Sequence, residues 1–181
     1  EPRTNANGSR PPNPNMIAAM QAIMDTSRGS RNACQTALHV AACDGSTAVV
    51  ESLLSLGVPV DAEDGSYQST ALMHASKNGH HVTTGALLKA GACVNAAMKN
   101  GWNALSLACR SGHNHLVIQL IEARAELDAI TQDGRTPLMV ASAQGHRAVV
   151  CTLIDAGADI NAQAKSGDTA LTTACRNGRM E

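Results

Sequence analysis

Apolar residues recur at helical spacing in short stretches of this chain, and glycines separate most of the stretches. The clearest example runs from residue 136 to residue 157. Its second half carries one apolar stripe, formed by Val149, Val150, Leu153 and Ile154. This is the spacing of a helix that buries one face. The stretch therefore predicts two short helices, the first ending at Gly145 and the second closed by Gly157.

The residues at the ends of this stretch fit the start and the exit of a helix pair. Residues 133–135 (Asp-Gly-Arg) form a turn signal directly before it. Thr136 is expected to cap the first helix and Pro137 to occupy its first position, because threonine satisfies a free amide and proline has none. After Gly157, residues 158–162 predict an extended arm that leads to the next turn.

The same helical phrase occurs five times along the chain. The phrases begin at Thr36, Thr70, Asn103, Thr136 and Thr169. The steps between them are 34, 33, 33 and 33 residues, and the extra residue of the first step falls in the loop 63–69. A fixed period in this range is typical of a stacked array, in which each unit buries its apolar face only against its neighbours.

Residues 136–162 (TPLMVASAQGHRAVVCTLIDAGADINA) resemble an ankyrin repeat, and four units carry the pattern. The resemblance covers about residues 33–178, although the Thr-Pro-Leu-His signature of the family is never complete. It implies an all-α fold, an ankyrin-repeat solenoid of stacked helix-turn-helix units with projecting β-hairpin loops. It also implies protein–protein binding, with no catalysis and no cofactor.

The predicted organisation has three parts. Residues 1–15 are expected to be a flexible linker. Residues 16–32 predict an N-terminal capping helix and loop, the alternative being a methionine-rich helix that binds a partner. Residues 33–181 hold the ankyrin repeats, four full units plus a truncated fifth. Because terminal repeats usually carry a polar outer face, we expect further ankyrin repeats C-terminal in the full-length protein; the alternative is an end sealed by self-association.

Composition narrows the class of partner. The net charge is −1 with both signs mixed, which argues against binding to nucleic acid or to an anionic membrane. The absence of an 18-residue apolar run argues against membrane insertion. The chain has no Phe, so its core must be aliphatic. Its six cysteines form no CxxC pair and are expected to be reduced thiols in a cytoplasmic or nuclear protein.

Seven histidines raise the possibility of a metal site. His80, His113 and His146 share one repeat position, directly after a turn glycine. Equivalent residues of stacked helices lie about 8–10 Å apart, whereas the ligands of one zinc ion lie about 2 Å from it. We therefore expect structural or solvent-facing histidines and no metal site. No nucleotide, hydrolase or metalloprotease motif is present, so no enzyme is predicted.

One position predicts backbone strain. Arg124 stands where the other units have Gly57, Gly91 and Gly157. If Arg124 is left-handed, a strain of about 1–2 kcal/mol is expected.

Trp102 is the strongest single candidate for partner binding. It is the only Trp, it directly precedes the cap of the third phrase, and its counterparts Arg135 and Asp168 are polar. Exposed Trp, Tyr and Arg are favoured binding hot spots. The alternative is that Trp102 only folds against its own hairpin.

In the ankyrin family, partners are commonly held by hairpin tips and by exposed positions of the first helices, on the concave surface. Carried onto this chain, those positions are Tyr67, Ser69, Lys77, Asn78, Lys99, Asn100, Trp102, Arg110, Gln132, Asp133, Arg135, Gln144, Lys165, Asp168 and Arg176. The main interpretation is a non-catalytic scaffold that binds a protein partner there. The alternative is a regulatory or targeting domain of a larger enzyme, channel or nucleic-acid-binding protein.

A lesser hypothesis concerns modification. Ankyrin arms resemble substrates of an asparaginyl hydroxylase that prefers an upstream Leu, an acidic residue and then Asn. Leu153, Asp159 and Asn161 match that pattern, so Asn161 is a possible hydroxylation site. Asn95 fits less well, because Cys93 replaces the acidic residue.

Overall fold

The protein is a stack of short helix pairs. A computed structural model describes residues 31–65 and 67–179. The helices of these residues are α2 (Arg31–Cys43), α3 (Thr47–Ser55), α4 (Ala71–Asn78), α5 (His81–Lys89), α6 (Ala104–Ser111), α7 (Asn114–Glu122), α8 (Pro137–Gln144), α9 (Arg147–Asp155) and α10 (Ala170–Arg176). We number the units by these pairs: α2 and α3 form unit 1, α4 and α5 unit 2, α6 and α7 unit 3, and α8 and α9 unit 4, while α10 belongs to unit 5.

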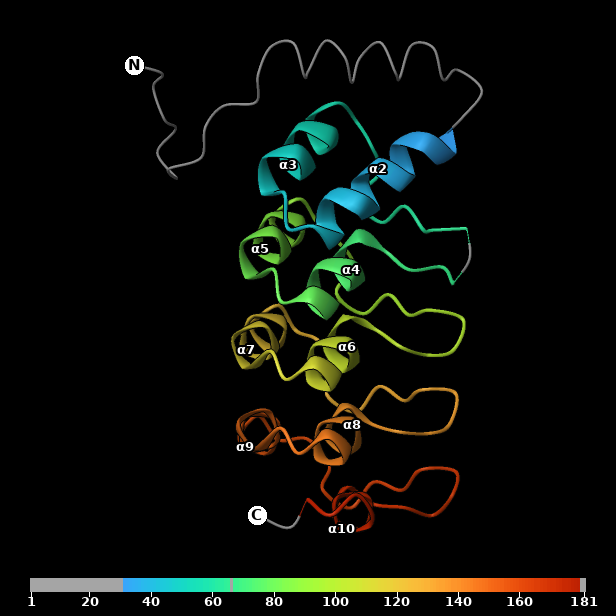
Figure 1. The fold of residues 1–181 in the computed structure, drawn as a ribbon, viewed down its shortest axis with the longest axis vertical. Coiled ribbons are helices and arrows are strands. Elements are labelled where there is room, and N and C mark those ends of the chain that lie inside the picture. The colour runs from blue at the N-terminus through green and yellow to red at the C-terminus, as the bar shows by residue number, and fades with distance from the viewer. Residues whose placement is uncertain (1–30, 66, 180–181) are drawn as a thin grey trace.

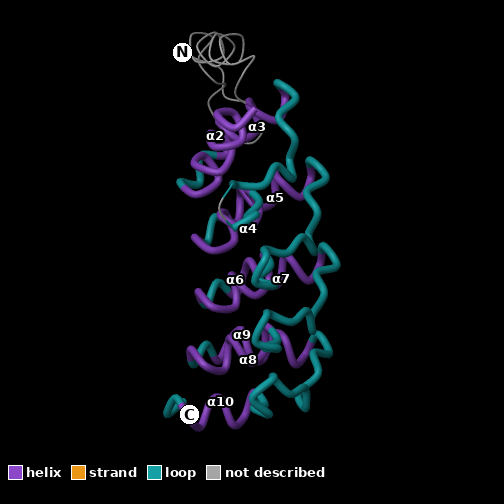
Figure 2. The backbone as a smooth tube through the Cα atoms, turned by 90° about the vertical axis from the view of Figure 1, so that its right-hand side faces the viewer, coloured by secondary structure: helices purple, strands orange, loops and turns teal. Residues whose placement is uncertain are grey.

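The helices form two columns. In units 1 to 4 the two helices of a unit pack on each other, and equivalent helices of successive units pack on one another, down to α10 on α8. Figure 1 shows the first helices of the units in one column, the second helices in another, and the hairpins projecting beside the first column. Figure 2 shows the same stack from the side, with successive units one below another. The predicted all-α solenoid is confirmed.

Local capping explains where the first helices begin. The Asn103 side chain accepts a hydrogen bond from the backbone N–H of Ser106 (2.8 Å), and the Ser106 hydroxyl accepts one from the backbone N–H of Asn103 (2.9 Å). Such a reciprocal pair satisfies two amides that the helix leaves free. In unit 4, Thr136 caps the helix and Pro137 takes its first position. Both predictions for unit 4 are therefore confirmed.

The core is a ladder of aliphatic side chains that the units share. One leucine of the first helix is almost fully buried in each of units 1 to 4: Leu38, Leu72, Leu105 and Leu138. The equivalent Leu171 of α10 is 71% exposed, against 1% for Leu138. The difference follows from stacking, because a further first helix of the described chain packs on each of α2, α4, α6 and α8, whereas α10 is the last of these helices.

The hairpins share one register, except the first. Met98, Thr131 and Ala164 each donate a backbone hydrogen bond to the carbonyl four residues ahead, whereas Asp64 donates to Ser69, five residues ahead. The extra residue predicted in the loop 63–69 therefore lies inside this hairpin. The hairpins also contact one another, because the backbone N–H of Gln132 donates to the carbonyl of Asn100 (2.8 Å).

Two residues other than glycine have a left-handed backbone in the described part of the chain. Arg124 has a φ of 66° and Gln68 a φ of 59°. Arg124 therefore has the left-handed backbone on which the expected strain depends, and the strain itself stays a prediction. Gln68 occupies the hairpin position that Gly101 and Gly134 hold in later units. The repeat period does not align these three residues, because the first hairpin contains one extra residue.

The N-terminal boundary differs from the expectation. Helix α2 begins at Arg31, so residues 31 and 32 belong to this helix and not to the preceding loop. The repeat period predicts a helix start near Thr36, which instead lies inside α2. The predicted linker (1–15) and the rest of the predicted capping helix and loop (16–30) lie outside the described residues. None of the described helices has the length and apolar character needed to span a bilayer.

Candidate functional site

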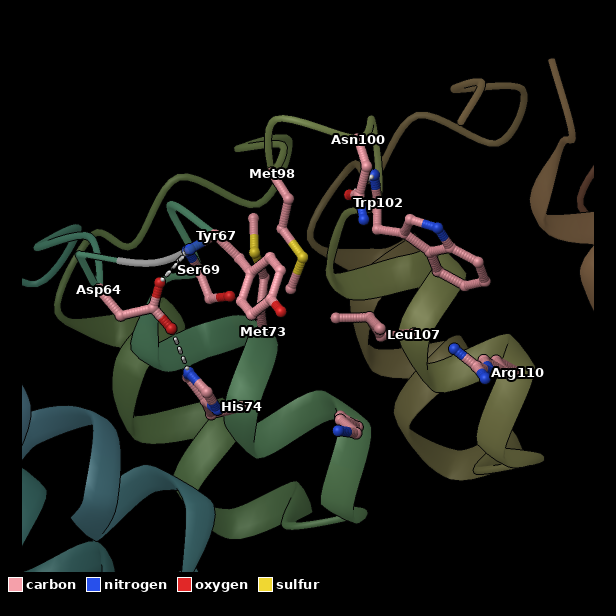
Figure 3. Close-up of a pocket in the computed structure, with 11 residues that line it drawn as sticks. Asp64, Tyr67, Ser69, Met73, His74, Met98, Asn100, Trp102, Leu107 and Arg110 are labelled. Atoms are coloured by element: carbon pink, nitrogen blue, oxygen red, sulfur yellow. Dashed lines mark hydrogen bonds and ion pairs between the residues drawn. The ribbon is translucent and has the colours of Figure 1, made fainter. Parts of the chain in front are cut away.

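A groove runs between the hairpins of units 2 and 3 and their first helices. Its volume is about 510 Å³. It is lined by Asp64, Tyr67, Ser69, Met73, His74, Lys77, Met98, Asn100, Trp102, Leu107 and Arg110. Figure 3 shows the ring of Tyr67 near the side chains of Met73 and Met98, with Trp102 and Arg110 at the other end. Two hairpins and two helices, α4 and α6, therefore contribute to one surface.

Trp102 forms one wall of this groove. The hairpin holds Trp102 in place through its backbone. The carbonyl of Trp102 accepts a hydrogen bond from the backbone N–H of Met98 (2.8 Å), and the backbone N–H of Trp102 donates one to the Asn100 side chain (3.3 Å). The indole is half-buried, and the Cζ atom of Arg110 lies 5.3 Å from the centre of its ring. An arginine over an indole face is attracted by the ring quadrupole. Trp102 thus packs on its own unit and still faces the groove.

The middle of the groove is apolar. Met73 and Leu107 are buried and form its floor, while Met98 is half-buried above them. Tyr67 is 66% exposed at the rim. Methionine side chains are flexible and polarizable, so they adapt to differently shaped apolar ligands. This part of the groove can therefore take up an apolar side chain.

The opposite end of the groove holds a hydrogen-bonded carboxylate. Asp64 accepts from the backbone N–H groups of Tyr67 (3.1 Å) and Ser69 (3.0 Å) and from His74 Nε2 (3.3 Å). Burial alone raises the pKa of Asp64, but these hydrogen bonds hold it below its ordinary value. Burial lowers the pKa of His74, and its hydrogen bond to Asp64 only partly offsets this. Asp64 is thus engaged within the protein.

A second, smaller hollow lies on the other side of Trp102. Its volume is about 180 Å³. It is lined by Trp102, Arg110, Arg135, Val140, Ala143 and Gln144. Both guanidinium side chains are exposed, and no carboxylate lines this hollow. Trp102 and Arg110 therefore separate an apolar groove from a basic hollow.

The three equivalent histidines connect neighbouring units by hydrogen bonds. Nε2 of His80, His113 and His146 donates to the carbonyl of Cys43, Lys77 and Arg110 respectively, each in the preceding unit, over 2.8 to 3.1 Å. This fits the structural role expected from their spacing. Within residues 31–65 and 67–179, no three His, Cys, Asp or Glu side chains are grouped so that they could hold a metal ion.

Comparison with known families places this architecture. A family model described as ankyrin repeats (3 copies) matches this chain twice, over residues 12–98 and over residues 86–164. The two matches together cover well over half of the chain. The chain belongs to the ankyrin-repeat family. Ankyrin repeats are in general protein–protein interaction modules, and their fold is typically non-catalytic. A comparison with curated proteins finds no matching relative.

The ankyrin fold brings about half of the predicted site residues together. Those that line the groove or the hollow beside it are Tyr67, Ser69, Lys77, Asn100, Trp102, Arg110, Arg135 and Gln144. Ser69 among them is buried, so it offers little surface to a partner. The groove residues that sequence reasoning missed are Asp64, Met73, His74, Met98 and Leu107.

The remaining predicted residues line neither hollow. They are Asn78, Lys99, Gln132, Asp133, Lys165, Asp168 and Arg176. Asn78 bridges two units of the ankyrin stack, since its Nδ2 donates to the carbonyls of Cys43 (3.2 Å) and His74 (3.1 Å). Asp168 and Arg176 form an ion pair with each other.

Proposed function

We propose that this ankyrin array is a non-catalytic scaffold that binds a protein partner on its concave face, in the groove beside Trp102. The observation that carries the proposal is the placement of a half-buried Trp102 and an exposed Tyr67 around one apolar groove. Anchors of this kind dominate the binding energy of protein interfaces when a partner covers them. The flexible methionines between them support an apolar contact.

Substitution of the two aromatic anchors tests this proposal. Wild-type protein, Trp102→Ala and Tyr67→Ala are used as baits in cells, with Val82→Ala on α5 as the matched control, because Val82 is exposed in the other helix column. A partner bound in the groove is lost with both groove variants and retained with Val82→Ala. Circular dichroism and urea midpoints establish that the variants are folded. Retention of every partner by both groove variants contradicts the proposal.

The proposed cellular location and the proposed lack of catalysis are each supported by a separate observation. A position in the cytoplasm or nucleus is supported by the free thiols of Cys43, Cys93, Cys109, Cys151 and Cys175. The proposed lack of catalysis is supported by the use of the equivalent histidines and of Asp64 in hydrogen bonds within the protein.

Hydroxylation of Asn161 belongs to the same proposal. Asn161 is exposed, and its backbone N–H donates to Asp159 (2.9 Å), which leaves its side chain out of this contact. The side chain of Asn95, by contrast, accepts from the N–H of Glu126 (2.9 Å) and donates to the carbonyl of Arg124 (3.4 Å). Mass spectrometry of protein from cells should find one added oxygen on Asn161, and consistent absence of this oxygen counts against the hypothesis.

A further inference from the structure

Two positions recur in ankyrin units 2 to 5, the residue before the helix cap and the residue eight further along. These pairs are Ser69 and Lys77, Trp102 and Arg110, Arg135 and Ala143, and Asp168 and Arg176, in units 2 to 5. Two of the pairs show direct contact, since Arg110 stacks on Trp102 and Arg176 donates from Nη1 to Asp168 Oδ2 over 2.7 Å. In units 3 and 5 the fold therefore brings the side chains at these positions together.

Unit 5 shows how the fold holds a carboxylate at this place. Both terminal nitrogens of Arg176 donate to Asp168, one to each carboxylate oxygen. A planar guanidinium matches the two oxygens of a carboxylate, which makes this contact stronger than a neutral hydrogen bond. Asp168 accepts a further bond from the hydroxyl of Ser166 (2.6 Å). The acid of unit 5 is thus supplied by the chain itself.

Units 3 and 4 each have an arginine at one of these two positions but no acidic residue at the other. Arg110 takes the helix position, while Arg135 takes the hairpin position, and both line the hollow beside Trp102. The ion pairs of the described residues are His74 with Asp64 and Arg176 with Asp168, so neither of these two arginines forms an ion pair there. The hydrogen bond from Arg176 lowers the pKa of Asp168 in the next unit, and the positive charge of Arg135 helps to lower it. The Arg110 guanidinium contacts the indole of Trp102 through cation–π attraction, which does not use up its N–H donors as a hydrogen bond would.

We infer that the partner segment is an acidic peptide, with an Asp or Glu carboxylate held between Arg110 and Arg135 and a neighbouring apolar side chain in the groove on the other side of Trp102. This inference rests on the proposed function and specifies the chemistry of the partner. The geometry supports it because the indole is shared by both hollows. Lys77, exposed at the groove, adds a further positive charge, and the only acid lining the groove, Asp64, is already hydrogen-bonded.

A peptide carboxylate fits this hollow better than a nucleic acid does. Binding along a phosphate backbone needs several cations in a row, whereas unit 5 neutralises its own arginine and the hairpin tip of unit 4 carries Asp133. The net charge of the chain is −1. The positive charge is therefore local, at the scale of one or two side chains.

A random peptide library displayed on phage and selected on the immobilised full chain tests the inference. Selected peptides should combine an Asp or Glu with a nearby apolar residue. A synthetic peptide of the selected sequence should lose about tenfold or more in affinity on Arg135→Gln, because a charge-assisted hydrogen bond is removed. Arg147→Gln, an exposed arginine of α9, is the matched control and should leave the affinity unchanged.

A double-mutant cycle assigns the contact to one pair of groups. Replacement of the peptide Asp by Asn should weaken binding to wild-type protein by a similar factor and should have little further effect on Arg135→Gln. A cycle with no coupling overturns the inference. Tighter binding of a matched phosphopeptide, or of single-stranded nucleic acid, overturns the assignment to a carboxylate.

The selection also separates the inference from the proposed function. Peptides that need Trp102 but carry no acidic residue leave the groove as a binding site and overturn only the acidic chemistry. Peptides that bind Trp102→Ala as well as wild type, or failure to select any binding peptide, count against both.

Discussion

The imidazole of His146 lies directly over the backbone of Gly112 in the preceding ankyrin unit. A Cβ atom on Gly112 would lie 2.7 Å from this ring, and His146 Nε2 donates to the carbonyl of Arg110 (3.1 Å). The same arrangement joins Gly45 to His80 and Gly79 to His113. The histidines that follow the turn glycines therefore fix the spacing between neighbouring units.

This contact predicts that Gly112→Ala is more damaging than Gly91→Ala. Both glycines have a positive φ, 76° and 88°, so either alanine carries backbone strain of about 1–2 kcal/mol. A Cβ on Gly91 meets no atom within 4 Å, whereas a Cβ on Gly112 collides with His146. We expect Gly112→Ala to lower the free energy of unfolding by about 1 kcal/mol or more beyond Gly91→Ala, measured by urea denaturation.

Removal of the ring provides the control. In the background of His146→Ala, the extra cost of Gly112→Ala should disappear, because the colliding group is gone. If the extra cost is the same with and without the ring, stacking of His146 on Gly112 does not explain the glycine.

Arg124→Gly should stabilise the protein. Arg124 is exposed and left-handed, and glycine adopts this backbone without the steric cost that a Cβ brings. We expect a gain of about 1 kcal/mol, seen as a higher urea midpoint. Arg124→Ala is the matched control, since it removes the charge but keeps the Cβ, and it should bring no gain. A drop in stability for Arg124→Gly contradicts this account of the position.

Two neighbouring threonines should respond to valine with opposite signs. Thr83 and Thr84 are both fully buried in α5, but the Thr83 hydroxyl lies 2.7 Å from that of Thr47, whereas the Thr84 hydroxyl has no hydrogen-bond partner. Thr84→Val removes an unsatisfied group and should stabilise by about 1 kcal/mol, while Thr83→Val should destabilise by about the same amount. Calorimetry or urea unfolding checks this, and equal signs refute it.

The stability of the protein should fall with acid partly through His74. Burial lowers the pKa of His74 from its ordinary value of 6.5, despite its hydrogen bond to Asp64, and nearby His39 and Lys77 lower it further. The unfolded state therefore binds the proton more readily, so this contribution is complete above about pH 6.5 and is lost as the pH falls through the folded pKa. Between about pH 7 and pH 5, His74→Leu should lose less stability than wild type.

Leucine suits this substitution because Leu107 occupies the same position in unit 3. His115→Gln, at an exposed histidine of α7, is the control. Between about pH 7 and pH 5 it should lose as much stability as the wild type. Identical loss in His74→Leu and wild type would show that His74 does not contribute.

The scaffold could be predicted from the sequence because its rules are local. The cap at Asn103, the stop at Gly145 and the strained backbone at Arg124 each depend on a few residues within one period. The start of α2 could not be predicted from the sequence, because the repeat period predicts a first helix shorter than the 13 residues observed. The left-handed Gln68 was missed because an inserted residue shifts the alignment of its hairpin.

The candidate site could be predicted only in part. Trp102 was identifiable because its counterparts are polar, but nothing in the sequence pattern singles out Met98 or Leu107. Only the packed structure shows that they border an open groove. The ion pair of Asp168 with Arg176 was missed for a similar reason, since it depends on how a hairpin is placed against a helix eight residues away.

Site-specific photo-crosslinking in cells tests the central claim most directly. A photoreactive phenylalanine derivative, which keeps an aromatic ring at the anchor position, is placed at Tyr67 in the groove or at Val82 in the other helix column; the native residues are 66% and 60% exposed. The account predicts a discrete crosslinked protein from position 67 that is absent from position 82 and is lost when Trp102→Ala is added. Equal crosslinking from both positions, or crosslinking at 67 that survives Trp102→Ala, would contradict it.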